Sequence, residues 1–202
     1  DGINYACGLT LGGLALSYFV NPWLGAPLYL LAVFCLWFFR DPDRTAPPGD
    51  IMVSPADGKV VSIKRLNEMQ TRISIFLNVF NVHVNRSPVA GEITDIRYQQ
   101  GKFLVASAED ASTQNEQNTF TVRSGESTIV FSQIAGLIAR RIVCFKKSGD
   151  TVAMGERVGL IKFGSRMDII FGPEWDVAVT SGQKVSAGSS VLAARKPVET
   201  RG

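Results

Sequence analysis

The sequence has few of the residues on which metal-binding and disulfide-rich proteins depend. Its 202 residues include one histidine and three cysteines, Cys7, Cys35 and Cys144, which lie far apart in apolar surroundings. A structural zinc site takes four closely spaced His or Cys ligands, so we expect no metal. Three scattered cysteines also fit no disulfide framework, which favours a reducing compartment.

Charged residues are scarce as well. They make up 19% of the chain, the net charge is +3, and no basic stripe with interleaved aromatic residues occurs. We therefore expect no nucleic-acid partner. The glycine-rich fingerprints of dinucleotide and P-loop sites are missing too. Enzymes that use pyridoxal phosphate are usually much larger than this chain, so that cofactor is not expected.

Hydrophobic residues make up 46% of the chain and crowd into its first forty residues. Residues 5–20 and 23–39 carry no charge, and Asn21-Pro22 separates them. Each run is somewhat shorter than the roughly 20 residues that span a bilayer, and aromatic residues at the run ends match a membrane interface. A signal peptide is the alternative, but it has a single apolar run after a basic segment. We predict a membrane-associated helical hairpin over residues 1–40.

The segment after the hairpin is rich in proline and contains the first basic residues. Prolines at 42, 47 and 48 prevent a continuing helix, which predicts a juxtamembrane linker over residues 41–50. Arg40 and Arg44 follow the apolar runs, and basic residues favour the cytoplasmic side. We therefore predict attachment to the cell (inner) membrane, with the rest of the chain on its cytoplasmic face.

From residue 51 onward, short β-type runs alternate with turns. This pattern predicts a mainly β (α+β) domain over residues 51–202, with a β-sandwich or barrel-like core. Residues 149–158 and 182–191 repeat the pattern Gly-x-x-Val-x-x-Gly-x-x-Val, which resembles the turns of biotinyl and lipoyl carrier domains. Those carriers need a lysine within Met-Lys-Met or a similar hairpin tip, and no such tripeptide occurs.

Three residues far apart in the sequence are candidates for chemistry. Ser165 follows Gly164 inside an apolar, strand-like run, where a glycine indicates a bulge or a close backbone approach. Asp57 lies in an Asp-Gly turn, and His83 is the single histidine. Each has a structural alternative: a barrel kink, a turn former and a buried histidine. Together they match what a serine needs to attack its preceding carbonyl, namely a base, a flexible glycine and oxyanion donors.

Several short motifs, in this order and spacing, resemble those of phosphatidylserine decarboxylases, a pyruvoyl-dependent family. The resemblance runs from about residue 33 to 194. Phe-Gly-Ser-Arg, where longer members have Leu-Gly-Ser-Thr, is similar to the short-form branch. The motifs are Phe-Phe-Arg-Asp-Pro (38–42), Pro-Ala-Asp-Gly (55–58), Val-His-Val-Asn-Arg-Ser-Pro (82–88), Asn-Glu (115–116), Gln-Ile-Ala-Gly (133–136), Ala-Arg-Arg-Ile (139–142) and Gly-Glu-Arg-Val-Gly to Phe-Gly-Ser-Arg (155–166).

The resemblance implies that the chain cleaves itself between Gly164 and Ser165, into chains 1–164 and 165–202, and that Ser165 becomes a covalent pyruvoyl group. The ketone of that group would form a Schiff base with the substrate amine and accept electrons as carbon dioxide leaves. Asp57 falls on the family aspartate that supports processing, and His83 on the histidine near the pyruvoyl. Longer members have a second histidine where this chain has Arg86. Either His83 therefore serves both stages, or Asp57 acts with another group.

The resemblance implies conversion of phosphatidylserine to phosphatidylethanolamine at a membrane, with the cleaved fragment as a partner and a homodimer left open. Substrate-binding candidates are Arg86 and Arg166 for the phosphodiester, and Asn115 and Glu116 for the serine head group. Two alternatives remain. The substrate could be another serine phospholipid such as archaetidylserine, or the chain could be a non-catalytic, membrane-tethered adaptor of the biotinyl/lipoyl type.

Overall fold

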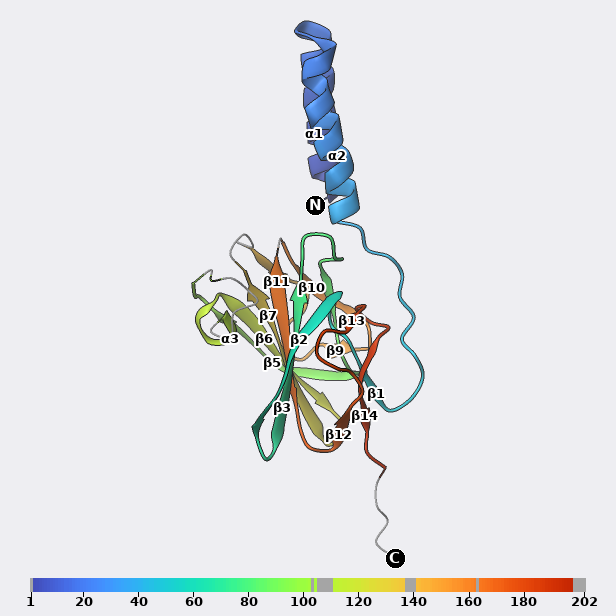
Figure 1. Cartoon of the computed structure of the whole chain (residues 1–202), viewed down its shortest axis with the longest axis vertical. Helices are drawn as coiled ribbons and strands as arrows, with labels where there is room; N and C mark the ends of the chain where they lie inside the picture. The colour runs from blue at the N-terminus through green and yellow to red at the C-terminus, as the bar shows by residue number, and fades with distance from the viewer. Residues whose placement is uncertain (1, 103, 105–110, 137–140, 163, 198–202) are drawn as a thin grey trace, which may run out of the picture. The chain divides into compact units, whose positions relative to one another are not determined.

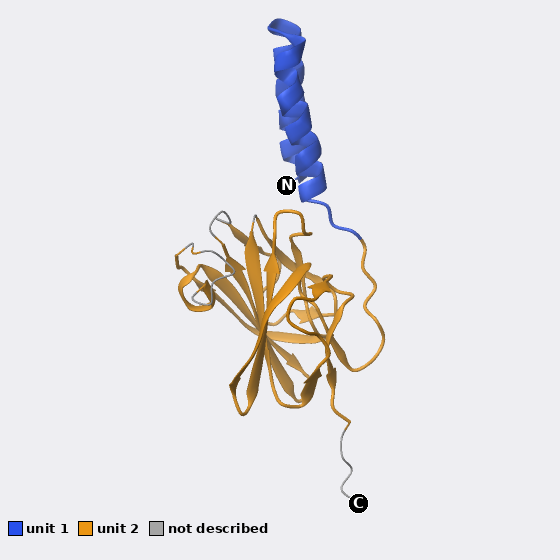
Figure 2. Ribbon diagram, in the orientation of Figure 1, with its two compact units in different colours: residues 1–42 blue, residues 43–202 orange. Residues whose placement is uncertain are grey.

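The computed structural model describes residues 2–102, 104, 111–136, 141–162 and 164–197. The chain forms two compact units, Asp1–Pro42 and Asp43–Gly202 (Figure 2). The first unit is helical, and the second consists almost entirely of strands (Figure 1). The prediction of a mainly β protein with few helices is confirmed.

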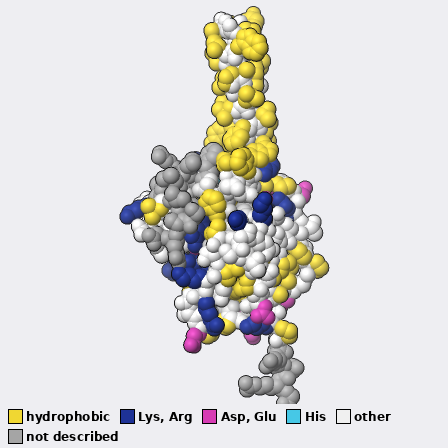
Figure 3. Space-filling model, in the orientation of Figure 1, with side chains coloured by type: hydrophobic (Ala, Val, Ile, Leu, Met, Phe, Trp, Pro, Cys, Tyr) yellow, Lys and Arg dark blue, Asp and Glu magenta, His cyan; other side chains and the backbone are white. Residues whose placement is uncertain are grey.

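Two antiparallel helices form the first unit, α1 (Gly2–Phe19) and α2 (Pro22–Phe38). Asn21 caps α2, since its Oδ1 accepts a hydrogen bond from Trp23 N at 2.9 Å. Most of the surface of the pair is apolar (Figure 3), with Leu11, Trp23 and Leu30 among its exposed side chains. Within the described residues, neither helix reaches the length and apolarity needed to cross a membrane. Membrane association of this pair stays a prediction.

An eight-stranded, strongly curled sheet forms the body of the second unit (Figure 1). Its strand order is β13-β2-β3-β11-β7-β6-β5-β9, and every neighbouring pair is antiparallel. The strands are β2 (Gly58–Asn67), β3 (Gln70–Leu77), β5 (Gly91–Gln99), β6 (Gln117–Ser124), β7 (Ser127–Ala135), β9 (Thr151–Val152), β11 (Ser165–Phe171) and β13 (Lys184–Val185).

Two three-stranded sheets complete this unit, with the orders β1-β14-β12 and β4-β10-β8. A single turn of helix, α3 (Ala111–Gln114), precedes β6. The remaining strands are β1 (Ile51–Val53), β4 (Val84–Arg86), β8 (Ile142–Cys144), β10 (Arg157–Ile161), β12 (Trp175–Val177) and β14 (Val191–Arg195).

The core lies on one face of the curled sheet. Alternate residues of the central strands β3 and β11, such as Ile73, Ile75, Met167 and Ile169, are fully buried in it. The intervening residues of β11 are buried as well, so this strand is enclosed on both faces. The element that begins at Ser165 is therefore a central strand, whose position is fixed by packing on both sides.

The repeated glycine–valine segments adopt the same local geometry. Gly149, Gly155, Gly182 and Gly188 all have positive φ values between 72° and 91°. Val152 of the first segment and Val185 of the second each pair with a glycine at the start of a long strand, in β5 and β2 respectively. The segments are thus structurally equivalent turns, although no likeness to biotinyl or lipoyl carrier domains is supported beyond the sequence pattern.

Candidate active site

Ser165 lies at the first position of β11, directly after a glycine with an unusual backbone conformation. Gly164 has φ +49°, in the left-handed region that side chains disfavour. Ser165 is fully buried and sits between Leu77 of β3 and Ala135 of β7. Among the described residues, no group forms a hydrogen bond with Ser165 Oγ. A buried hydroxyl without such a bond is uncommon in proteins and needs an explanation, of which a catalytic role is one.

His83 lies beside the same segment, on the connection between β3 and β4. It is 2% exposed, and its carbonyl oxygen accepts a hydrogen bond from Ile161 N at 3.2 Å. The two segments 77–83 and 161–165 therefore meet at both ends: Leu77 pairs with Ser165, and His83 with Ile161. The structure thereby places the single histidine next to the segment that carries Ser165.

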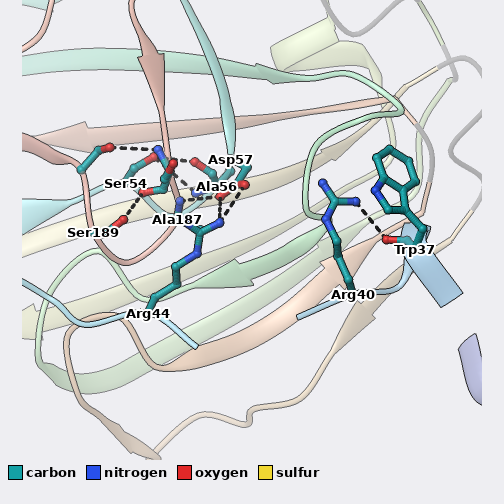
Figure 4. A network of polar contacts seen from close by, with 10 residues as sticks. Trp37, Arg40, Arg44, Ser54, Ala56, Asp57, Ala187 and Ser189 are labelled. Carbon is teal, nitrogen blue, oxygen red and sulfur yellow. Dashed lines mark hydrogen bonds and ion pairs between the residues drawn. The ribbon is translucent and has the colours of Figure 1, made fainter. Parts of the chain in front are cut away.

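Asp57 is held in the turn before β2 by two partners (Figure 4). Its Oδ1 accepts a hydrogen bond from Ala187 N at 2.8 Å, and its Oδ2 lies 3.1 Å from Arg44 Nη2. In the same turn, the Ser54 hydroxyl donates to the carbonyl of Ala56 at 2.7 Å. The carboxylate therefore has a fixed orientation and a balancing cation.

Asp57 also lines a pocket of about 510 Å³, together with residues of the loop after β3. Asn78, Phe80 and Asn81 of that loop contribute to the pocket, and His83 follows two residues later. Loop 78–83 therefore has a relation to each candidate residue. It begins directly after Leu77, the strand partner of Ser165, it shares a pocket with Asp57, and it ends at His83. The joint action of these three residues in self-cleavage stays a prediction.

Two of the residues predicted to bind substrate are buried and hydrogen-bonded to the backbone. Arg86 is 5% exposed, and its Nη1 donates to the carbonyl of Gly155 at 3.0 Å. Asn115 is fully buried. Its amide donates to the carbonyls of Leu104 and Ala135, and its Oδ1 accepts from Leu104 N. Asn115 therefore stabilises the chain at Ala135, the strand partner of Ser165.

The other two predicted substrate residues have different surroundings. Arg166 is 2% exposed. It is held by Asp168 Oδ1 at 2.6 Å and by Ser74 Oγ at 2.7 Å. The ion pair with Asp168 fixes the side chain of the residue directly after Ser165. Glu116 is half-buried, and the pKa of Tyr98 is raised by desolvation and then by a hydrogen bond with the Glu116 carboxylate. Substrate contact by these four residues stays a prediction.

Comparison with known proteins assigns the chain to a family. The family model for phosphatidylserine decarboxylase matches residues 31–193. A phosphatidylserine decarboxylase proenzyme of Solibacter usitatus is 58% identical over 96% of this chain and 95% of its own length. Proteins of the same name are 45% identical in Syntrophus aciditrophicus and 47% identical in Solidesulfovibrio magneticus, over 95% and 96% of this chain and 94% of each relative. The chain belongs to the phosphatidylserine decarboxylase family.

The family assignment confirms the resemblance, whereas membership of the short-form branch stays a prediction. The word proenzyme in the names of all three relatives fits a chain that is cleaved after synthesis. Within the described residues, no cluster of three His, Cys, Asp or Glu side chains could hold a metal ion.

Sequence reasoning missed the cation that faces Asp57. Arg44 lies in the proline-rich segment that was predicted to be only a linker, yet its guanidinium pairs with the candidate aspartate. It also missed Lys59 and Lys184, which line the pocket beside Asp57. A basic residue directly after the Asp-Gly turn was the available signal for Lys59, but the pairing of Lys184 with Lys59 depends on strand register.

The positive φ of Gly164 leads to a specific expectation for Gly164→Ala. Among the described residues, a Cβ at this position would meet no atom within 4 Å, so the substitution adds backbone strain of about 1–2 kcal/mol without a steric clash against them. We expect self-cleavage to slow markedly while the fold persists, as followed by the appearance of two fragments over time.

Gly125→Ala is the matched control for this experiment. Gly125 has φ +59° and equally open surroundings, but it lies in the turn between β6 and β7. This variant carries the same kind of strain and should cleave at the wild-type rate. Equal rates in the two variants would show that the backbone conformation of Gly164 has no part in cleavage.

Proposed function

We propose that this chain decarboxylates phosphatidylserine to phosphatidylethanolamine, using a pyruvoyl group that it makes from its own Ser165. The observation that carries this proposal is the Gly164-Ser165 junction of a chain in the phosphatidylserine decarboxylase family. There a buried serine hydroxyl without a hydrogen-bond partner among the described residues follows a left-handed glycine. A structural serine would be expected to have such a partner.

The self-cleavage proceeds within the chain. Ser165 Oγ attacks the carbonyl carbon of Gly164 and gives up its proton to a base, so that the amide becomes an ester. Removal of the Ser165 α-proton then breaks the ester, which leaves a carboxylate on Gly164 and a dehydroalanine at residue 165. Water replaces the nitrogen of that residue as ammonia, and the products are chains 1–164 and 165–202.

We assign the proton transfers to His83 and a supporting role to Asp57. A histidine can accept a hydroxyl proton near neutral pH, and His83 lies on the loop that runs alongside the cleavage segment. Asp57, held by Arg44 and Ala187, lines a pocket to which that loop also contributes. Arg86 stands where longer family members have a second histidine, so in this chain we assign both processing and decarboxylation to His83.

The chain's own residues would hold the pyruvoyl group at the start of β11. Leu77 and Ala135 pair with residue 165 on either side, and the Arg166–Asp168 ion pair anchors the residues that follow. Once formed, the group supplies an electron sink for the loss of carbon dioxide. The buried position of residue 165 excludes bulk water, which protects a reactive carbonyl and strengthens nearby electrostatic interactions.

We further propose that the helical unit attaches the chain to the cytoplasmic face of the cell membrane. Its exposed residues Leu11, Trp23 and Leu30 form part of an apolar surface that would be unfavourable in water (Figure 3). A diacyl substrate leaves the bilayer only at about 0.8 kcal/mol per CH₂, so an enzyme acting on its head group gains from staying there. Flotation of the full chain with lipid vesicles tests this attachment. A chain left behind by the floating vesicles would contradict it.

The activity is tested with the purified full chain in detergent micelles that contain phosphatidylserine. We expect release of carbon dioxide and formation of phosphatidylethanolamine in proportion to the cleaved fraction. Archaetidylserine, supplied in the same micelles, distinguishes the second candidate substrate. Fully cleaved protein that releases no carbon dioxide from phosphatidylserine would contradict the proposed activity.

A further inference from the structure

The turn that carries Asp57 is built twice in this chain. Residues 54–58 and 87–91 both read Ser-Pro-x-x-Gly. In each copy, the serine hydroxyl donates to the carbonyl two residues later, at 2.7 Å in both. A Cβ on the final glycine of either copy would lie 2.3 or 2.2 Å from a backbone carbonyl oxygen, so both turns require glycine. The two copies are thus one structural unit used twice.

The two copies differ in the charged residues around the turn. Strand register equates its Gly58–Val185 pair with the Gly91–Val152 pair of the second copy. By this register, Asp57, Lys59 and Lys184 take the places of an alanine, a glutamate and a threonine. Because the second turn forms without them, the fold does not need these three charges. Their counterparts in the second copy are Ala90, Glu92 and Thr151.

The two lysines stand directly opposite each other in the β2–β13 pair. Like charges at such positions destabilise a sheet. Among the described residues, no carboxylate forms an ion pair with Lys59 or Lys184. In the second copy the corresponding charge has a partner, since Glu92 forms an ion pair with Arg123 at 2.5 Å. An unfavourable pair that the fold does not require suggests a ligand of opposite charge.

The pocket around these lysines offers mainly hydrogen-bond donors. Asn78 Oδ1 accepts from Phe80 N at 2.8 Å, and Asn81 Oδ1 accepts from Asn78 N at 2.9 Å. Both amide oxygens are therefore occupied by backbone donors, which leaves the NH₂ groups as the hydrogen-bonding groups that these side chains can offer. Both residues line the pocket. The carboxylate of the pocket, Asp57, is already held by its own partners. Two ammonium groups and two amide NH₂ groups together favour an anion.

We propose that this pocket of about 510 Å³ binds the phosphodiester of the lipid head group, with Lys59 and Lys184 as its charged contacts. The inference rests on the function proposed above and names the binding site for that substrate's phosphate. Asn78 directly follows Leu77, the strand partner of Ser165, so the pocket lies at the end of β3 where Ser165 pairs. Phe80, which is 67% exposed, provides an apolar surface at the same pocket for the glycerol and acyl portion.

The kinetic test uses the double variant Lys59→Gln/Lys184→Gln and short-chain phosphatidylserine in nonionic micelles, which carry no surface charge of their own. Self-cleavage should go to completion, and KM should rise about ten- to a hundredfold, as for the loss of charge-assisted hydrogen bonds. The value of kcat should fall far less. Lys147→Gln/Lys196→Gln removes the same charge outside the pocket and should leave KM unchanged.

An equilibrium test identifies which anionic group the lysines contact. The full-length Ser165→Ala chain is titrated with glycerophosphoserine and with glycerophosphoethanolamine, which lacks the carboxylate. Addition of the two lysine substitutions should lower the affinity of the chain for both ligands by a similar factor. Weakening of glycerophosphoserine alone would place the lysines at the carboxylate and overturn the proposal, as would failure of the Ser165→Ala chain to bind either ligand.

The remaining outcomes separate this inference from the proposed function. If the double variant loses affinity for anionic vesicles but keeps its KM in nonionic micelles, the lysines serve the membrane surface and the inference fails alone. If the cleaved wild-type chain releases no carbon dioxide, yet the lysines still control the binding of both phosphodiesters, the proposed activity fails and the binding site stands.

Discussion

The variant Ser165→Ala should remain one chain of 22.0 kDa and release no carbon dioxide from phosphatidylserine. Alanine lacks the hydroxyl that attacks the Gly164 carbonyl, so neither the ester nor the pyruvoyl group can form. Intact mass after prolonged incubation measures cleavage, and carbon dioxide release measures activity. Both should fall below detection, which is the largest effect that the proposed mechanism predicts.

Ser132→Ala is the control for this variant. Ser132 is a buried serine on β7, and its hydroxyl is hydrogen-bonded to Thr119 Oγ1 at 2.8 Å. Loss of that hydrogen bond should lower stability modestly and leave cleavage complete. Cleavage of Ser165→Ala at the wild-type position, or formation of phosphatidylethanolamine by it, would contradict the assignment of Ser165.

The variant His83→Gln should lose decarboxylation. Glutamine keeps most of the buried volume and the ability to form hydrogen bonds, but it cannot take up and release a proton near neutral pH. Loss of general acid–base catalysis typically lowers rates by about 10²–10⁴-fold, and we expect a reduction in that range. Activity is measured per cleaved chain, with the cleaved fraction determined by intact mass.

The two stages can be scored separately in this variant. If cleavage is also blocked, His83 acts in processing, as its position beside residues 161–165 suggests. If cleavage is complete but decarboxylation is lost, His83 acts in the second stage alone and another group is the processing base. Complete cleavage together with wild-type activity would exclude His83 from the mechanism.

The sequence predicted the class of fold and the buried strand around Ser165 because both depend on local patterns. Short β-type runs with glycine turns indicated a mainly β domain, and an apolar run interrupted by Gly164-Ser165 marked β11. The repeated glycine–valine pattern also appeared as two equivalent turns. In each case the residues that determine the structure lie within about a dozen positions of one another.

The surroundings of the site could not be predicted in the same way. Every residue of β11 except Ile170 is buried, so alternation of polar and apolar residues did not reveal on which face each side chain lies. Arg166 therefore looked available for substrate, whereas it pairs with Asp168 on the same strand and with Ser74, which strand register brings to it from 92 residues away. The contact between Arg44 and Asp57 also depends on how the segment before β1 folds back.

The intact mass of the purified full chain, with and without a carbonyl-reactive amine such as hydroxylamine, tests the central claim most directly. The proposed mechanism predicts two fragments divided between Gly164 and Ser165. The smaller one should lack a free amino terminus and gain the mass of the amine adduct that a ketone forms. A single chain that stays uncleaved on prolonged incubation and does not react with hydroxylamine would contradict the claim that Ser165 becomes a pyruvoyl group.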